Sequence, residues 1–190
     1  IITTPAIAAR LSPDGTLLAF HDVKGYEDEF RKHHTSSVTR DIWTYDLTTK
    51  QYKQVSSFIG EDRNPVFSAD GRSLYYLSEE KGSFNVFRMP VGGGATTQVS
   101  FLKDHPVRSL TMSNDGTLCY NYRGEVYTQK DGGQPVKLNV RFAADSRYNP
   151  DVTKSVNGGA RELSVSSNGK EVAFVHRGEV FVTSVAEGTT

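Results

Sequence analysis

One pattern runs through the whole chain: a serine, one further residue, Asp or Asn, and then a glycine, followed by an apolar run. It occurs four times, in LSPDGTLLAF (Leu11–Phe20), FSADGRSLYYL (Phe67–Leu77), MSNDGTLCYNY (Met112–Tyr122) and VSSNGKEVAFV (Val165–Val175). The turn glycines lie at positions 15, 71, 116 and 169, which are 56, 45 and 53 residues apart. Repeats of about 40–50 residues are typical of β-propeller blades.

Each of these motifs predicts a β-hairpin. Glycine adopts a positive φ without a Cβ clash, and Asp or Asn before it tolerates the left-handed region and can hydrogen-bond its own backbone. Asp-Gly or Asn-Gly between two apolar runs is a strong signal for two antiparallel strands joined by a tight turn.

Further strand-like runs, rich in Val, Tyr, Phe and Thr, follow every hairpin. A third strand is predicted at Asp41–Leu47, Phe84–Val91, Gly124–Lys130 and Gly178–Val185. A fourth strand is predicted at Gln51–Phe58, Thr96–Phe101 and Pro135–Phe142, and the last repeat lacks one. The expected fold is therefore all-β, a β-propeller fragment of about four four-stranded blades.

We expect residues 1–190 to form a single propeller segment with repeats at about 5–60, 61–105, 106–145 and 160–190. Ile1–Pro5 has the pattern of the end of a fourth strand. The two chain ends could pair and close one blade, or the chain could be part of a longer propeller. The second interpretation is favoured, because four blades are at the low end of the known range.

The balance of charge argues against two classes of partner. Lys+Arg and Asp+Glu are both 22, so the net charge is zero. A neutral chain lacks the broad positive field that binds nucleic acid or anionic membranes. No apolar run approaches the roughly 18 residues of a membrane span. We therefore expect no nucleic acid and no membrane insertion.

No motif in the sequence predicts catalysis, a metal site or a cofactor. G-x-S-x-G and H-E-x-x-H are absent, and VGGGATT (Val91–Thr97) is a turn between strands and not a phosphate loop. The adjacent His33 and His34 would point to opposite faces of an extended backbone, so they could not hold one metal ion together. We predict no catalytic residue, no metal and no cofactor.

The candidate site comes from the topology of the loops. In a propeller, the loops between strands two and three lie on the same face as the connections between blades. Long insertions fall there at Val23–Arg40 and Ala143–Gly159, with Gly60–Pro65 between blades, and long loops are often functional. The candidates for binding a peptide or partner are Arg31, His33, His34, Arg40, Asp62 and Arg63. The alternative is that these are solvated loops, or internal struts in which Arg and Asp pair.

Several longer stretches resemble bacterial homologues of the tricorn protease, which are large serine peptidases of the S41 type. They are Arg31–Asp46 (RKHHTSSVTRDIWTYD), Gly60–Gly71, Gly82–Phe87 and Gly178–Val185. The hairpins alone are also similar to the PD40 repeats of TolB-like proteins. The chain departs from the tricorn pattern in length, with about four blades where that family builds rings of six or seven.

The resemblance implies a non-catalytic propeller that contacts or gates peptide substrate, or packs on other domains of the parent protease. It also implies a possible homo-oligomer and a periplasmic or secreted location, with a cytoplasmic one as the alternative. Two other functions stay open: a free-standing TolB-like protein-binding propeller, and the propeller cap of a prolyl-oligopeptidase-like hydrolase.

Overall fold

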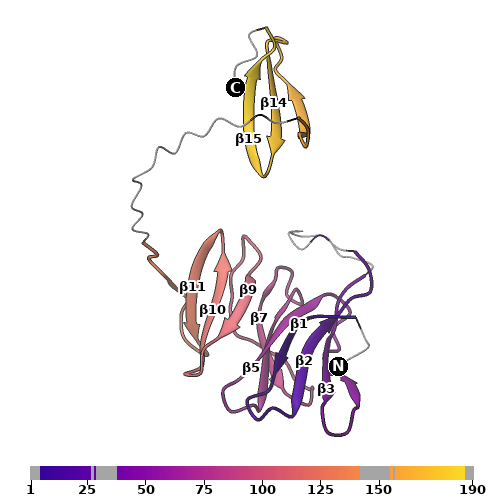
Figure 1. The fold of residues 1–190 in the computed structure, drawn as a ribbon. Coiled ribbons are helices and arrows are strands. Elements are labelled where there is room, and N and C mark those ends of the chain that lie inside the picture. The colour runs from indigo at the N-terminus through magenta and orange to yellow at the C-terminus, as the bar shows by residue number, and fades with distance from the viewer. Residues whose placement is uncertain (1–4, 27, 29–37, 142–154, 156, 187–190) are drawn as a thin grey trace. The chain divides into compact units, whose positions relative to one another are not determined.

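The computed structural model describes residues 5–26, 28, 38–141, 155 and 157–186, and these form fifteen strands in four antiparallel sheets (Figure 1). No helix occurs among the described residues, and none therefore is long and apolar enough to cross a membrane. The all-β prediction is confirmed. The chain divides into two compact units, Ile1–Val140 and Arg141–Thr190, which are described separately. The prediction of one continuous propeller segment remains a prediction.

The strands of each sheet lie in chain order. The first sheet contains β1 (Ala6–Leu11), β2 (Leu17–Asp22), β3 (Ile42–Asp46) and β4 (Tyr52–Gln54). The second contains β5 (Asp62–Phe67), β6 (Ser73–Ser78), β7 (Asn85–Pro90) and β8 (Thr97–Gln98). The third contains β9 (Arg108–Met112), β10 (Thr117–Tyr122), β11 (Glu125–Lys130) and β12 (Val136–Lys137). The C-terminal sheet contains β13 (Arg161–Val165), β14 (Glu171–His176) and β15 (Glu179–Ser184).

The same pattern of hydrogen bonds recurs in each of the four predicted hairpins. In the second sheet, Ser68 donates its hydroxyl hydrogen to the carboxylate of Asp70 at 2.6 Å and accepts the backbone N–H of Ser73 at 2.9 Å. Ser166 makes the matching bonds in the C-terminal sheet, to Asn168 at 2.8 Å and from the N–H of Glu171 at 3.0 Å. The turn glycines all have positive φ. The hairpin prediction is therefore confirmed at each of the four motifs.

The fourth strands are shorter than predicted, with only two or three paired residues each. A Gln-Val-Ser motif ends two of them. The backbone N–H groups of Val55 and Ser56 both donate to the carbonyl of Ile42, and the Ser56 hydroxyl accepts the N–H of Ile42 at 2.9 Å. Val99 and Ser100 bond Val86 in the same way. Because both amides converge on one carbonyl, the chain leaves the sheet there and the ladder ends.

The first strand of every sheet contains a residue in the left-handed region and an irregular register. These residues are Ala8, Asn64, Ser109 and Glu162, with φ of 53°, 54°, 57° and 55°. The pairing shifts at the same places. A bulge of this kind bends the strand and increases its twist. Only one of the four residues is Asn, so this repeated feature was invisible in the sequence.

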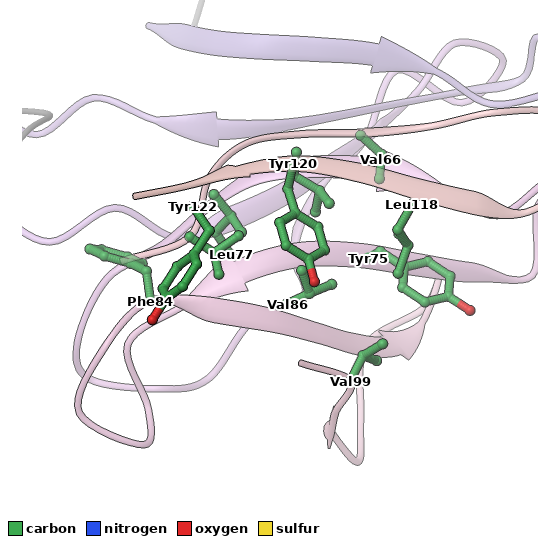
Figure 2. Packing of buried hydrophobic residues seen from close by; sticks show 11 residues of the cluster. Val66, Tyr75, Leu77, Phe84, Val86, Val99, Leu118, Tyr120 and Tyr122 are labelled. Atoms are coloured by element: carbon green, nitrogen blue, oxygen red, sulfur yellow. The ribbon is translucent and has the colours of Figure 1, made fainter. Parts of the chain in front are cut away.

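The core of the first unit lies on both faces of the second sheet. On one face, buried side chains of the first and second sheets form a cluster that includes Ala19, Ile42, Leu74, Tyr76 and Phe87. On the other face, side chains of the third sheet point toward the second (Figure 2), in a cluster that includes Leu77, Val86, Leu118, Tyr120 and Tyr122. The second sheet is thus covered on both sides, as a propeller blade is by its neighbours.

Candidate functional site

The predicted meeting of the strand two to strand three loop with the connection between blades is confirmed in the first unit. The backbone N–H of Asp62 donates to the carbonyl of Arg40 at 2.9 Å. The Thr39 hydroxyl donates to the carbonyl of Ile59 at 3.1 Å. The end of the Val23–Arg40 insertion therefore lies against the segment that leads from the first sheet into β5.

A buried ion-pair cluster joins these two segments. Nη1 of Arg40 lies 3.2 Å from Oε1 of Glu61, and Nη1 of Arg63 lies 3.5 Å from the same oxygen. The three side chains are 5%, 0% and 5% exposed. The Arg63 guanidinium also stacks over the ring of Phe84, 4.3 Å from its centroid. Two guanidinium groups that share one buried carboxylate hold the loop in place, because removal of Glu61 would leave two buried positive charges uncompensated.

His21 connects the first sheet to the second beside this cluster. It is 1% exposed, and its Nδ1 accepts the backbone N–H of Asn64 at 3.2 Å. A neutral ring whose Nδ1 is an acceptor has its proton on Nε2. Burial, together with the positive charges of Arg40 and Arg63, lowers the pKa of His21 to about 3. The imidazole is therefore neutral near pH 7, and its contact with Asn64 is a structural link between β2 and β5.

Asp62 begins β5 and is 1% exposed. Within the described part of the chain, no hydrogen bond of normal geometry reaches either of its carboxylate oxygens. Burial raises the pKa of this carboxyl to about 7, the hydroxyls of Ser78 and Ser56 oppose the rise, and the charges of Asp41 and Glu80 add to it. A buried carboxyl with this environment is costly to ionise.

A pocket of about 310 Å³ opens next to Asp62. Its wall combines Ser57 and Phe58 from the connection between the first two sheets, Asp62, Tyr76 and Glu80 from the second sheet and the turn after it, and the loop residues 94–96. Oγ1 of Thr96 lies 3.4 Å from Oε2 of Glu80. The pocket therefore has two carboxyl groups and two aromatic side chains in its wall.

The predicted site residues fall into two groups. Arg31, His33 and His34 lie outside the described residues. Arg40, Asp62 and Arg63 come together at one place, and all three are buried. This is the arrangement of internal struts that the sequence left open, with Glu61 as the acid that pairs. The binding role assigned to the six residues stays a prediction.

The sequence analysis missed three residues of this region: His21, Tyr76 and Glu80. Glu61 lay in the predicted segment Gly60–Pro65 but was not among the binding candidates. A polar residue directly after the apolar run LLAF was the only signal for His21. Glu61 stood in a charged segment whose residue types give no sign of burial. No group of three or more His, Cys, Asp or Glu side chains in the described ranges could hold a metal ion.

Comparison with solved structures places the fold. The tricorn protease aligns with a TM-score of 0.62 at 18% identity, over 95% of this chain and 17% of that one. The fold is that of TolB-like and tricorn propellers. A putative TolB from Agrobacterium tumefaciens aligns with a TM-score of 0.57 at 19% identity, over 70% of this chain and 48% of that one. TolB from Acinetobacter baumannii aligns with a TM-score of 0.53 at 22% identity, over 93% and 40%.

These likenesses concern the fold alone, because every identity is below 25%. The chain spans less than half the length of the solved TolB proteins and about a sixth of the tricorn protease chain. Puromycin hydrolase also aligns, with a TM-score of 0.55 at 16% identity over 96% of this chain. No protein-family profile matches the sequence, and no curated protein is significantly similar to it.

Proposed function

We propose that this chain is a non-catalytic portion of a β-propeller in a tricorn-like serine peptidase of the S41 type. In this role it contacts or gates peptide substrate, or packs on other domains of the same protein. The observation that supports this most is the alignment with the tricorn protease over 95% of the chain. The stretch RKHHTSSVTRDIWTYD, which resembles that family, ends in β3 of the same aligned fold.

The proposed contact face is the one that carries the connections between sheets. Its long insertion, Val23–Arg40, is held at its C-terminal end by the buried Arg40–Glu61–Arg63 cluster. A rigid base under a long loop is the usual way in which a scaffold presents binding residues. The proposal includes a periplasmic or secreted parent protein and the possibility of a homo-oligomer.

The test compares surface and anchor residues in the full-length parent. We expect Arg31→Ala combined with His34→Ala to reduce peptide turnover while the protein stays folded and assembled. Arg40→Ala serves as a contrast, because it removes a buried ion pair and is expected to lower thermal stability. Unchanged turnover and unchanged assembly in the Arg31/His34 variant would contradict the proposal. The 190-residue chain alone is expected to cleave no peptide.

The same experiment distinguishes two alternative kinds of parent protein. The TolB structures favour a free-standing docking propeller, and the puromycin hydrolase structure favours the propeller of a hydrolase. A parent with no peptidase activity would support the first alternative. A parent whose activity depends on a G-x-S-x-G serine in another domain would support the second.

A further inference from the structure

The pocket beside Asp62 has a feature that the rest of the fold does not explain. Asp62 is 1% exposed, and no well-formed hydrogen bond within the described residues reaches its two carboxylate oxygens. A buried polar group without a partner costs free energy, and such a group in a native structure indicates an absent ligand or a special role. The hydroxyls of Ser56 and Ser78 lie beside this carboxyl and oppose the rise in its pKa, and each also accepts a backbone N–H, from Ile42 and Glu80 respectively.

A second carboxyl group faces the same pocket. Glu80 is a quarter exposed, accepts the weak hydrogen bond of Thr96, and pairs with the exposed Lys81 at 3.2 Å. Exposed pairs of this kind contribute little and are readily exchanged. The pocket therefore presents one buried and one accessible carboxyl to whatever enters.

Aromatic side chains complete the wall. Phe58 and Tyr76 both line the pocket. Burial raises the pKa of the Tyr76 phenol, and the charges of Asp62 and Glu80 add to the rise. Aromatic faces together with carboxylates favour ammonium or guanidinium groups, through cation–π attraction and charge-assisted hydrogen bonds.

A glycine-rich turn forms one border of the pocket. Residues 94–96 belong to the turn between β7 and β8, which contains three consecutive glycines. Gly93 and Gly94 have φ of +84° and +121°, and a Cβ on Gly93 would lie 2.8 Å from the carbonyl oxygen of Val55. Only glycine fits there, so the backbone of this turn lies directly against the connection between the first two sheets.

We propose that this pocket binds the basic side chain of a lysine or arginine, with Asp62 and Glu80 as its two anionic partners. The side chain belongs to a peptide substrate or to a peptide segment of a neighbouring domain, so the inference rests on and deepens the proposed function. The acceptors left open at Asp62 are satisfied when the cation is bound. The pocket then selects for basic residues in whatever the propeller contacts.

The test uses a probe that carries only the relevant side chain. The isotope-labelled 190-residue chain is titrated with Nα-acetyl-lysine methylamide and, in a parallel series, with the norleucine analogue that lacks the amine. We expect saturable shifts of the backbone amide signals of Glu80 and Thr96 with the lysine probe only. Equal shifts with the norleucine analogue, or no shifts near the pocket with the lysine probe, would overturn the inference.

Three variants locate the binding. Asp62→Asn keeps the shape of the side chain and removes its charge, and is expected to weaken the lysine probe at least about tenfold, as loss of a charge-assisted hydrogen bond does. Glu80→Gln is expected to weaken it by a smaller factor. Glu125→Gln, which breaks an exposed ion pair with Lys137 elsewhere in the unit, is the matched control and should leave affinity unchanged. If Asp62→Asn and Glu80→Gln both bind normally, the pocket is not the site.

The outcome is separable from that of the proposed function. A probe that binds at the pocket, in a parent whose peptide turnover is unaffected by Asp62→Asn, supports the basic-group site and contradicts its use by the peptidase. A parent that prefers peptides without Lys or Arg, with the connection face still required, supports the proposed function and contradicts the basic-group site.

Discussion

The second sheet and the C-terminal sheet contain the same hairpin motif and the same hydrogen bonds, yet they differ completely in burial. Leu74, Leu77 and Val86 of the second sheet are 0% exposed. Val165, Val180 and Val182 of the C-terminal sheet are 59%, 71% and 53% exposed. The same local signals therefore produce the sheet in both units, whereas a buried core is present where neighbouring sheets of the same unit cover its faces.

Truncation of a buried aromatic ring should have the largest effect on stability, and the effect should differ between the two units. Phe87→Ala should lower the free energy of unfolding of the first unit by about 3–5 kcal/mol, since the ring is 1% exposed and leaves a cavity. Phe181→Ala in the C-terminal sheet should cost much less, because that ring is only half-buried and packs mainly on Phe174, 5.6 Å away. Hydrogen exchange of amides in β6 and β14 measures the two units separately. Equal losses would contradict the comparison.

Asp62 is buried in the second sheet, and its ionisation makes the stability of the first unit depend on pH. The pKa of Asp62 is about 7 in the folded chain and near 3.8 when unfolded. The unfolded state therefore releases its proton first as pH rises, and stability falls between about pH 4 and pH 7. At about 1.4 kcal/mol per pKa unit, the loss above pH 7 is on the order of 2–4 kcal/mol.

His21 acts in the opposite direction. Its pKa is about 3 in the fold and 6.5 when unfolded, so stability falls as pH drops from 6.5 toward 3. The two effects nearly cancel between pH 4 and pH 6.5. Asp62→Asn should therefore stabilise the chain at pH 8 and expose a positive slope of stability with pH below 6.5. Urea unfolding across this range is the measurement, and a flat profile for the variant would show that His21 titrates normally.

Substitution of the turn glycines should cost the same in both sheets, because these residues act through the local backbone. Gly71 and Gly169 have φ of +70° and +68°, and no side chain or backbone atom would be closer than 3.6 Å to an added Cβ. Gly71→Ala and Gly169→Ala should each cost about 1–2 kcal/mol, the penalty of the left-handed region. We expect equal costs in the covered and the exposed sheet, from urea unfolding followed by a probe in each unit. A much larger loss of stability for Gly71→Ala than for Gly169→Ala would mean that burial also contributes to the cost of the substitution.

The smallest effect concerns the bulge in each first strand. Ala8 and Glu162 hold φ of 53° and 55°, where the second sheet has Asn64. Asn tolerates this region better than other residues with a side chain. Ala8→Asn and Glu162→Asn should therefore each raise stability by less than about 1 kcal/mol. A destabilised Ala8→Asn variant would show that the space around the bulge, and not its backbone angle, selects the residue.

Most of the strands and turns could be predicted from the sequence. The four hairpins and the third strands were predicted within one or two residues, because glycine, Asp and alternating apolar residues act through the local backbone. The two-residue turns at Arg123–Gly124 and Arg177–Gly178 have the same local origin, and all four residues have positive φ. The fourth strands were predicted too long, because the Gln-Val-Ser ending acts through a carbonyl of the neighbouring strand.

The candidate site was harder to predict. The loop topology correctly brought Arg40 together with Asp62 and Arg63, since strand order alone decides which loops share a face. Whether those charges face solvent or the interior is not a local property. Glu61 and Asp62 are adjacent acids of the same segment, yet Glu61 pairs with two guanidinium groups and Asp62 lies against a pocket.

The number of sheets, their hairpins and the order of their strands follow from local sequence, because each depends on backbone conformations that a few neighbouring residues select. The packing of the sheets decides which apolar faces form the core, which charges are buried, and why His21 and Asp62 have shifted pKa values. Burial and electrostatic environment are set by side chains from other strands and loops, such as Arg63 for His21 and Glu80 for Asp62. The residues that adjoin a position in the sequence do not show which of these side chains will lie beside it.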